Sequence, residues 1–294
     1  MLLKEEGARG IATTSLGLPS RRELIAWTLR ILKNSGLKLV DYLGQHFLID
    51  PRGVEYFING LKIWSGSDMV EIGPGLGTIT LYASRIASRI LAIELDHRLA
   101  NIVKSIVPDN VLVIVGDGVS FARAIKSEIL YSNTPYNISG RLIAMIARNN
   151  NIKYSLLGVQ LELAKRIIAN RGSKDYGRLT LLVERYFNAR IATLIPRSYY
   201  YPKPKVSGAI IELSRKREWR DGDEIFEDIL RCLFSNRNKK AYKIALKCLD
   251  NNVESSLSWL KEKRVKDLSL DDIEKLVEII NKPMLHTKEQ VAKL

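Results

Sequence analysis

The segment VEIGPGLGTIT, residues 70–80, decides the fold. Its apolar start predicts a strand, its glycines predict a tight turn and its end predicts a helix. Gly73, Gly75 and Gly77 let a nucleotide-like ligand approach the backbone beside the helix N-terminus. The spacing is G-x-G-x-G, and Thr78 stands where the dinucleotide fingerprint G-x-G-x-x-G has its last glycine. The turn therefore favours S-adenosylmethionine over NAD, and a dehydrogenase is the weakest alternative.

Around this turn, short apolar runs alternate with helical patterns. Such an alternation predicts an α/β fold, a Rossmann-like and mostly parallel sheet with helices on both faces. Two later strand candidates, 179–195 and 206–214, would form the far edge of the same sheet. The predicted strands of the alternating part are 68–73, 90–95, 111–117, 128–133 and 153–160, with helices beginning near residues 78, 97, 139 and 162.

From about Arg215 the pattern changes to short amphipathic helices without a strand signal. We therefore predict two domains, a cofactor-binding catalytic domain over 1–214 and a small all-α domain over 215–294. The first would start with a helical extension over 1–40, in which 20–36 has a broad apolar face and Gly36 as its stop.

Charge is the unusual part of the composition. The 294 residues include 46 Lys and Arg against 32 Asp and Glu, a formal net charge of +14. Residues 165–205 hold ten basic residues and only Asp175 and Glu184 as acids. A solvated face is the ordinary explanation, but such an imbalance favours an anionic partner, with RNA foremost. The candidate RNA-binding residues are Arg171, Lys174, Arg178, Lys203 and Lys205.

Cys232 and Cys248 are the only cysteines, and with three histidines they show no zinc or haem spacing, so no metal is expected. Glu5 and Glu6 lie where a signal peptide needs an apolar stretch. No segment approaches the roughly 20 apolar residues of a membrane span. These observations predict a cytoplasmic protein that does not contact membranes and keeps both thiols reduced.

Acidic residues end the next two predicted strands. Glu94 closes the second strand, where a carboxylate can accept both ribose hydroxyls of a nucleoside. Asp117 closes the third, where it can accept a hydrogen bond from an adenine amino group. Each acid could instead cap a helix, and Asp96 could take that role after the second strand. The glycine turn, Glu94 and Asp117 end three successive strands, and each could bind part of a nucleoside. This favours a bound nucleoside, because ligands bind at the carboxyl ends of parallel strands.

Asn133-Thr134-Pro135-Tyr136 ends the fourth predicted strand and carries the sharpest catalytic signal. The exocyclic nitrogen of adenine is a poor nucleophile, because its lone pair is delocalised into the ring. The Asn133 side-chain carbonyl and the adjacent main-chain carbonyl, held by Pro135, can accept from that amino group as it becomes tetrahedral. Tyr136 can stack on the base. The structural alternative is a proline turn capped by Asn133.

A second aromatic cluster, SYYYPKPK at 198–205, follows the basic stretch. Three consecutive tyrosines cannot all face a core, so at least one ring is expected at the surface, where it could stack on an extruded base. For Tyr199 and Tyr201, packing against neighbouring prolines is the preferred interpretation.

Together these segments resemble the ribosomal RNA adenine N6-dimethyltransferases of the KsgA type. The resemblance covers nearly all of the chain after about residue 40, and its combination of motifs is specific. The segments that carry it are LGQHFLID (43–50), VEIGPGLGTIT (70–80), AIELD (92–96), GD (116–117), NTPYNIS (133–139), QLELAKRIIANRGSKDYGRLTLLVERYF (160–187), PKPKVSGAIIEL (202–213) and FSNRNKK (234–240).

The resemblance implies a role for each matching residue. Tyr136 and Tyr200 would be the two stacking faces for the target base. Thr134 departs from the usual Leu, a change that should be tolerated because the backbone carbonyl is needed there, although a hydroxyl contact could be added. The implied catalytic residues are Asn133, Thr134, Pro135, Tyr136 and Tyr200, and the cofactor contacts are His46, Leu48, Gly73, Gly75, Glu94, Asp117 and Asn133.

The resemblance also implies an activity. It is that of a class I S-adenosylmethionine-dependent methyltransferase acting on N6 of two adjacent adenines near the 3′ end of small-subunit ribosomal RNA, in ribosome biogenesis. S-adenosylhomocysteine would be the product, and the partner would be the RNA or a precursor particle, bound by a monomer. A large-subunit methyltransferase of the resistance type is one alternative, which the YGRL and FSNRNKK segments disfavour. A non-catalytic RNA-binding assembly factor is another, which the intact catalytic run disfavours.

Overall fold

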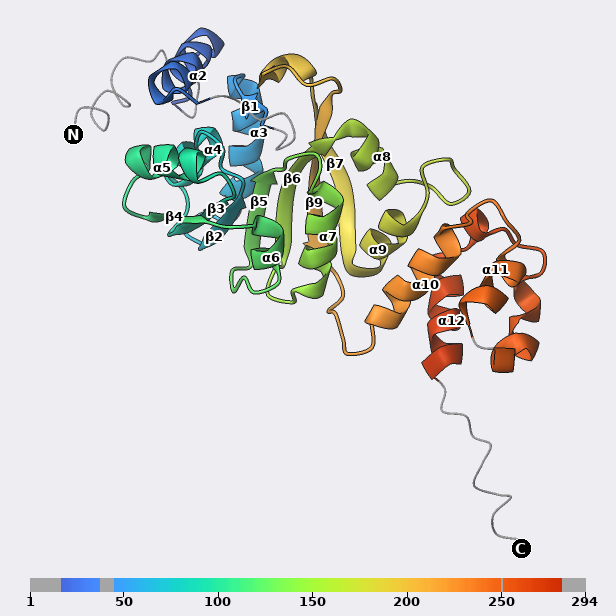
Figure 1. Cartoon of the computed structure of the whole chain (residues 1–294). Helices are drawn as coiled ribbons and strands as arrows, with labels where there is room; N and C mark the ends of the chain where they lie inside the picture. Colours follow the sequence, from blue (N-terminus) through green and yellow to red (C-terminus); the bar gives the residue numbers. More distant parts are fainter. Residues whose placement is uncertain (1–16, 38–44, 250, 282–294) are drawn as a thin grey trace, which may run out of the picture. The chain divides into compact units, whose positions relative to one another are not determined.

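The computed structural model describes residues 17–37, 45–249 and 251–281 and divides the chain into two compact units (Figure 1). The first unit combines the chain up to Ala164 with Phe187–Glu218, and the second combines Lys165–Tyr186 with the chain from Trp219 onward. The predicted catalytic domain, 1–214, therefore contains a segment that the structure assigns to the second unit. Of the predicted 1–40 extension, residues 1–16 and 38–40 lie outside the described residues.

Seven strands form one sheet in the first unit. They are β2 (Met69–Ile72), β3 (Ile90–Glu94), β4 (Val111–Val115), β5 (Ile129–Asn133), β6 (Tyr154–Gln160), β7 (Phe187–Ile195) and β9 (Gly208–Arg215). Their order is β4-β3-β2-β5-β6-β9-β7; the first five run parallel, and β9 and β7 add an antiparallel edge. The predicted mostly parallel α/β sheet is confirmed.

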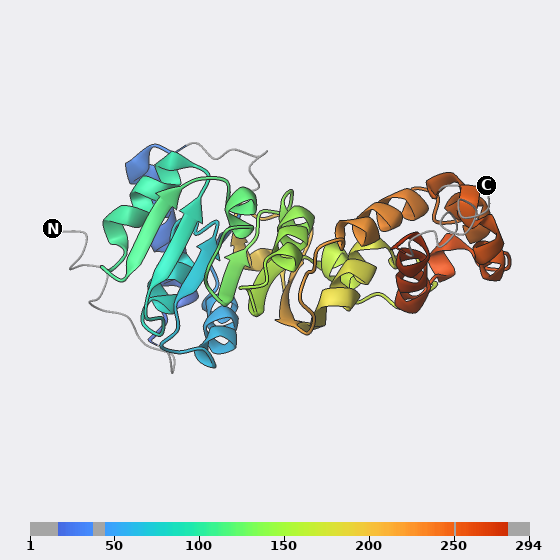
Figure 2. The same ribbon diagram turned by 90° about the horizontal axis from the view of Figure 1, so that it is seen from below.

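Helices cover both faces of this sheet (Figure 2). They are α3 (Pro51–Lys62), α4 (Thr78–Ala83), α5 (His97–Ile106), α6 (Gly118–Ala122) and α7 (Ser139–Arg148), with α2 (Arg21–Ser35) before them and α8 (Leu161–Ile167) where the chain passes between units. Ser20 and Glu23 form a capping box on α2. Asp50, Asp96 and Asp117 each cap a helix by accepting from the N–H two residues on.

Burial of the sheet on both faces makes a rigid platform for the strand ends. Every residue of β2 is buried, as expected for a central parallel strand. One core joins Phe57 of α3, Ile79 of α4 and Val103 of α5 to Tyr131 and Leu156 of the sheet. Side chains at the ends of these strands are therefore held in fixed positions.

A separate two-stranded ladder joins two parts of the first unit that are far apart in sequence. Strand β1 (Phe47–Leu48) pairs antiparallel with β8 (Tyr200–Tyr201). Leu48 opposes Tyr200 in this ladder, and Phe47 opposes Tyr201. The loop before α3 and the tyrosine cluster are thus brought side by side.

The second unit is helical. It contains α9 (Arg178–Tyr186), α10 (Glu224–Phe234), α11 (Ala241–Cys248) and α12 (Leu270–Asn281), with 3-10 segments at Asn251–Leu260 and Val265–Asp267. The first half of the strand predicted at 179–195 is wrong, because Arg178–Tyr186 is a helix and only Phe187–Ile195 is a strand. Residues 180–183, 185 and 186 are all buried, and a short, mostly buried helix is hard to tell from a buried strand by its pattern.

A buried arginine ties the helices of this unit together. Arg185 Nη2 lies 2.9 Å from Asp223 Oδ1, and its Nε lies 2.8 Å from Glu274 Oε1. Its guanidinium also lies over the Phe226 ring, 4.0 Å from the centroid. Only 2% of the Arg185 side chain is exposed. Although it counts among the basic residues of 165–205, Arg185 is a structural cation and not part of a basic surface.

Cys232 of α10 and Cys248 at the end of α11 form a disulfide. The prediction of two reduced thiols is therefore wrong for this structure. The bond closes a loop between residues 16 positions apart within the second unit, and such a link restricts the unfolded chain. Sequence spacing could not show this, because pairing depends on how the two helices bring the side chains together.

Candidate active site

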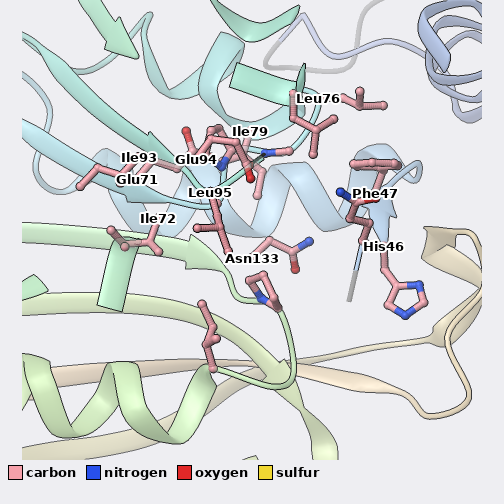
Figure 3. Close-up of a pocket in the computed structure, with 18 of the residues that line it drawn as sticks. His46, Phe47, Glu71, Ile72, Leu76, Ile79, Ile93, Glu94, Leu95 and Asn133 are labelled. Carbon is pink, nitrogen blue, oxygen red and sulfur yellow. Dashed lines mark hydrogen bonds between the residues drawn. The ribbon is translucent and has the colours of Figure 1, made fainter. Parts of the chain in front are cut away.

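A pocket opens at the carboxyl ends of the central strands of the first unit (Figure 3). The chain starts the sheet at β2, adds β3 and β4 on one side and then continues with β5 on the other. Ligands bind at such a switch point in open parallel sheets. The residues predicted to contact a cofactor all line this pocket, namely His46, Leu48, Gly73, Gly75, Glu94, Asp117 and Asn133.

The glycine turn between β2 and α4 forms one wall of the pocket. Gly73, Gly75 and Gly77 have φ angles of 69°, 60° and 81°, a region that favours glycine. A Cβ at Gly75 would also lie 3.3 Å from the Phe47 ring. The predicted close approach of ligand to backbone is therefore available here.

Glu94 projects from the end of β3 and is itself held in place. Its two carboxylate oxygens accept hydrogen bonds from the N–H groups of Gly75 and Asp96, each at 3.0 Å. Burial raises the pKa of Glu94, and these N–H donors oppose that effect. A carboxylate oxygen has more than one acceptor site, so Glu94 can still accept from hydroxyls in the pocket.

Asp117 caps a helix and also lines the pocket. Its carboxylate caps α6, accepting from the Val119 N–H at 3.1 Å and from the Ser120 hydroxyl at 2.7 Å. The Ser120 hydrogen bond is the main cause of a lowered pKa of Asp117. The residue also lines the pocket, so its proposed contact with adenine stays a prediction.

Asn133, Tyr136 and Tyr200 come together at the end of β5. The Tyr200 hydroxyl donates to Asn133 Oδ1 at 3.1 Å. A Cβ placed on Gly208 would lie 3.5 Å from the hydroxyls of both tyrosines, so both hydroxyls lie beside the same point of β9. Burial raises the pKa of Tyr136 to about 12, so its ring remains neutral. An amide oxygen has two lone pairs, so Asn133 can accept from a second donor as well.

The tyrosine cluster is arranged differently from the expectation. Tyr200, the implied stacking face, is buried with 4% of its surface exposed, whereas Tyr201, expected to pack on prolines, is 39% exposed. Tyr199 is half-buried beneath the Arg52 guanidinium, 4.8 Å from the ring centroid. The pairing of β8 with β1 is the cause, because alternate residues of a strand point to opposite sides. The described geometry gives Tyr200 a polar contact with Asn133.

Thr134 is buried, and its hydroxyl has no hydrogen-bond partner among the described residues. The hydroxyl contact considered for this departure is therefore absent from the described structure. The Thr134 backbone N–H donates to the Gly158 carbonyl of β6 at 3.0 Å, which fixes the peptide after Asn133.

His46 links the cofactor pocket to the aromatic cluster. Its Nδ1 lies 2.8 Å from the Pro202 carbonyl oxygen, and its ring centroid lies 5.9 Å from that of Tyr136. Because Phe47 and Leu48 pair with β8, the imidazole is positioned by both segments.

Two residues of the site were missed by the sequence analysis. Gly158 lies on β6 beside β5, and a Cβ there would come within 2.8 Å of Asn133 Oδ1. Glu71 is a fully buried carboxyl that lines the pocket. A glycine inside a strand and an acid inside an apolar strand were the signals that could have revealed them.

The predicted RNA-binding residues are all exposed, but they belong to different units. Arg171, Lys174 and Arg178 lie in or beside α9 in the second unit, and Lys203 and Lys205 follow β8 in the first. Another basic residue of the stretch, Arg190, pairs with Glu212 at 2.7 Å.

None of the helices in 17–37, 45–249 and 251–281 is both long enough and apolar enough to cross a membrane. In the same ranges, His, Cys, Asp and Glu form no group of three or more that could hold a metal ion.

The sheet order, the glycine turn and the acids at successive strand ends define a class I methyltransferase fold. A family model described as "Ribosomal RNA adenine dimethylase" matches residues 37–282. The chain belongs to this family of ribosomal RNA methyltransferases.

Individual proteins agree with this assignment. A protein of Aeropyrum pernix named "Probable ribosomal RNA small subunit methyltransferase A" is 42% identical over 207 residues, 69% of this chain and 75% of that protein. The crystal structure of a dimethyladenosine transferase from Plasmodium falciparum matches with a TM-score of 0.68 and 27% identity, covering 78% of this chain and 95% of that one. The 23S rRNA methyltransferase ErmE shares the fold, with a TM-score of 0.58, 21% identity and coverage of 80% and 100%.

Proposed function

We propose that this protein uses S-adenosylmethionine to methylate N6 of adenines in small-subunit ribosomal RNA, with two adjacent adenines near the 3′ end as the target. The observation that carries the proposal is the position of Asn133, which lines the cofactor pocket and also contacts the aromatic cluster. A side chain in that position can touch both a methyl donor and a target base. The names of the relatives from Aeropyrum pernix and Pyrobaculum aerophilum favour the small subunit over the large one.

The residues of the pocket fit the proposed cofactor. The glycine turn lacks Cβ atoms that would block a ligand, Glu94 can accept from ribose hydroxyls, and Asp117 lies beyond the next strand where an adenine would extend. When bound, S-adenosylmethionine supplies an activated methyl group on a sulfonium and leaves as S-adenosylhomocysteine.

The protein's own contribution is to position the target. Asn133 Oδ1 accepts a hydrogen bond from the N6 amino group and favours tetrahedral geometry at that nitrogen, so that the lone pair stays on nitrogen and is not delocalised into the ring. The main-chain carbonyl at Thr134 acts in the same way. Tyr136 holds the base by stacking. No general base is needed, because the N6 proton can leave after transfer. Tyr200 fixes the Asn133 side chain through its hydroxyl.

The contact between Tyr200 and Asn133 can be tested by removing one oxygen. Tyr200→Phe is expected to lower kcat by roughly 2- to 10-fold, the effect of losing a neutral hydrogen bond worth about 0.5–1.5 kcal/mol. S-adenosylmethionine affinity should change little, because Tyr200 itself does not line the pocket and Asn133 is still present in the variant. Single-turnover methylation and calorimetric titration measure the two effects separately. A kcat equal to that of the wild type would show that the hydroxyl does not position Asn133.

The basic residues should make RNA binding depend on salt. We expect a variant with Glu at Arg171, Lys174, Arg178 and Lys203 to bind RNA more weakly and to show a flatter plot of log affinity against log salt concentration. Each lost phosphate contact should make the slope less steep by about 0.9, the value for B-form DNA. Filter binding over a salt series measures that slope. A matched control is Arg231→Glu, which changes an exposed arginine on α10 outside this set. Wild-type affinity that does not respond to salt would contradict the electrostatic role.

One experiment tests the proposed activity directly. The protein is incubated with labelled S-adenosylmethionine and undermethylated small subunits, and the modified bases are mapped. Label on N6 of adjacent adenines near the 3′ end of the small-subunit RNA supports the proposal. Label only on large-subunit RNA would favour the resistance-type alternative, and tight binding without transfer would favour an assembly factor. Because the proposed substrate is ribosomal, we place the activity in the cytoplasm and propose that a monomer performs it.

A further inference from the structure

Three carboxyl groups line the cofactor pocket, and one of them, Asp117, has a cation nearby, Arg141. Among the described residues that line it, the ionisable acids are Glu71, Glu94 and Asp117, and no Lys or Arg is present. Glu94 and Asp117 are occupied by backbone N–H donors and, for Asp117, by a hydroxyl. Glu71 has no role in the mechanism described above, although its exposed fraction is only 1%. An ionised carboxyl that is buried without a cation is costly, unless a ligand supplies a positive charge beside it.

Glu71 lines the pocket from the central part of the sheet. It is on β2, which lies between β3, the strand of Glu94, and β5, the strand of Asn133. If Glu94 holds the ribose and Asn133 faces the methyl group, the sulfur that joins them lies over the end of β2. Figure 3 shows Glu71 and Glu94 close together on the same side of the pocket. The charged atom of the proposed cofactor and the buried carboxyl thus belong to the same part of the site.

The groups around Glu71 come from three neighbouring elements. The Tyr131 hydroxyl of β5 donates to Glu71 Oε2 at 3.0 Å. The Thr80 hydroxyl faces the carboxyl from α4, and the Glu94 carboxyl faces it from β3. Burial raises the pKa of Glu71 to about 7, which the two hydroxyls oppose and Glu94 reinforces. Near neutral pH the carboxyl is therefore poised between its neutral and its charged form.

We propose that Glu71 makes the pocket selective for the charge on the cofactor sulfur, so that it favours S-adenosylmethionine over S-adenosylhomocysteine. This inference rests on the proposed function. The two molecules share the adenosine and amino-acid parts, so contacts to those parts cancel in a comparison. They differ in the methyl group and in one positive charge, which the Glu71 carboxylate stabilises. Transfer of the methyl group removes that charge, and the product loses this attraction.

The proposal predicts that binding of the substrate is coupled to the protonation of Glu71 and that binding of the product is coupled to it much less. A bound sulfonium favours ionised Glu71 and lowers its pKa, so S-adenosylmethionine binding expels a proton from the protein near pH 7. Affinity for S-adenosylmethionine should therefore rise as the pH increases toward about 7 and become constant above it. Affinity for S-adenosylhomocysteine should change much less over the same range. Glu94 and His46 also line the pocket, but both remain in the variant used to isolate Glu71.

Calorimetric titration of the full chain with each ligand tests this inference. The titrations are made from pH 6 to pH 8 and in buffers of different ionisation enthalpy, which measures the protons released on binding. Glu71→Gln should reduce the preference for S-adenosylmethionine over S-adenosylhomocysteine at pH 8 by about tenfold, the factor that a pKa shift of one unit represents. It should also abolish the proton release. Glu128→Gln, which alters an exposed carboxyl just before β5, is the matched control and should change neither.

A second variant keeps the test decisive if Glu71→Gln does not fold. Tyr131→Phe removes the donor to Glu71, so the midpoint of the pH dependence should move to higher pH. An unchanged preference in folded Glu71→Gln, or an unchanged midpoint in Tyr131→Phe, would overturn the inference. A wild-type protein that binds neither ligand at any pH would overturn the proposed function instead.

Discussion

Arg185→Met is expected to destabilise the second unit by about 3–5 kcal/mol, the cost of breaking a buried ion pair from one side. The substitution keeps an apolar stem over Phe226 but removes the charge that faces Asp223 and Glu274. Asp223 is itself buried, so it would lose its cationic partner in a place with little access to water. Thermal and urea unfolding of the purified variant measure the loss.

Arg231→Met is the matched control for this prediction. Arg231 lies in α10 of the same unit and pairs with Asp228, but both side chains are more than half exposed. Exposed pairs of this kind contribute about 0–1 kcal/mol, so the control should unfold nearly like the wild type. Equal stability of the Arg185 and Arg231 variants would show that the buried pair does not stabilise the unit.

Asn133→Ala is expected to lower the rate of methyl transfer by about 10²-fold or more, the usual cost of losing one preorganised polar contact to a transition state. The contact matters most when N6 attacks the methyl group, so turnover should fall while RNA affinity, which depends on exposed basic residues, stays nearly unchanged. Single-turnover methylation and filter binding on the same RNA separate the two quantities.

Asn188→Ala provides the control for the catalytic variant. Asn188 is an exposed asparagine on the edge strand β7 of the same unit, so its removal should leave the rate intact. An Asn133→Ala protein that methylates as fast as the wild type would contradict the mechanism. A wild-type protein that binds small subunits and the cofactor but transfers nothing would favour the assembly-factor alternative.

The parallel sheet and its pocket were predictable because they depend on local patterns. Gly73, Glu94, Asp117 and Asn133 each follow a short apolar strand, and parallel strands bring their carboxyl ends to the same edge. The direction of the strands is therefore enough to predict that these residues lie near one another.

The features that the local sequence pattern did not reveal depend on long-range packing. The exposure of Tyr200 depends on the pairing of β8 with β1, a contact between distant segments that the local pattern does not contain. The same holds for Arg185, whose charge looked like part of a surface until α10 and α12 surrounded it. Residues 165–186 illustrate the same point, because their buried face is completed by residues that come much later in the chain.

That late completion has a consequence for synthesis on the ribosome. Leu181, Val183 and Tyr186 leave the exit tunnel before Trp219, whose ring stacks on Tyr186 at 5.2 Å, and before the helices that follow it. Domains usually fold as units while the chain emerges from its N-terminal end. Here the apolar side of α9 must wait, uncovered, while the last two strands of the sheet are added. A nascent chain of this protein therefore passes through an interval in which chaperone binding or aggregation competes with folding.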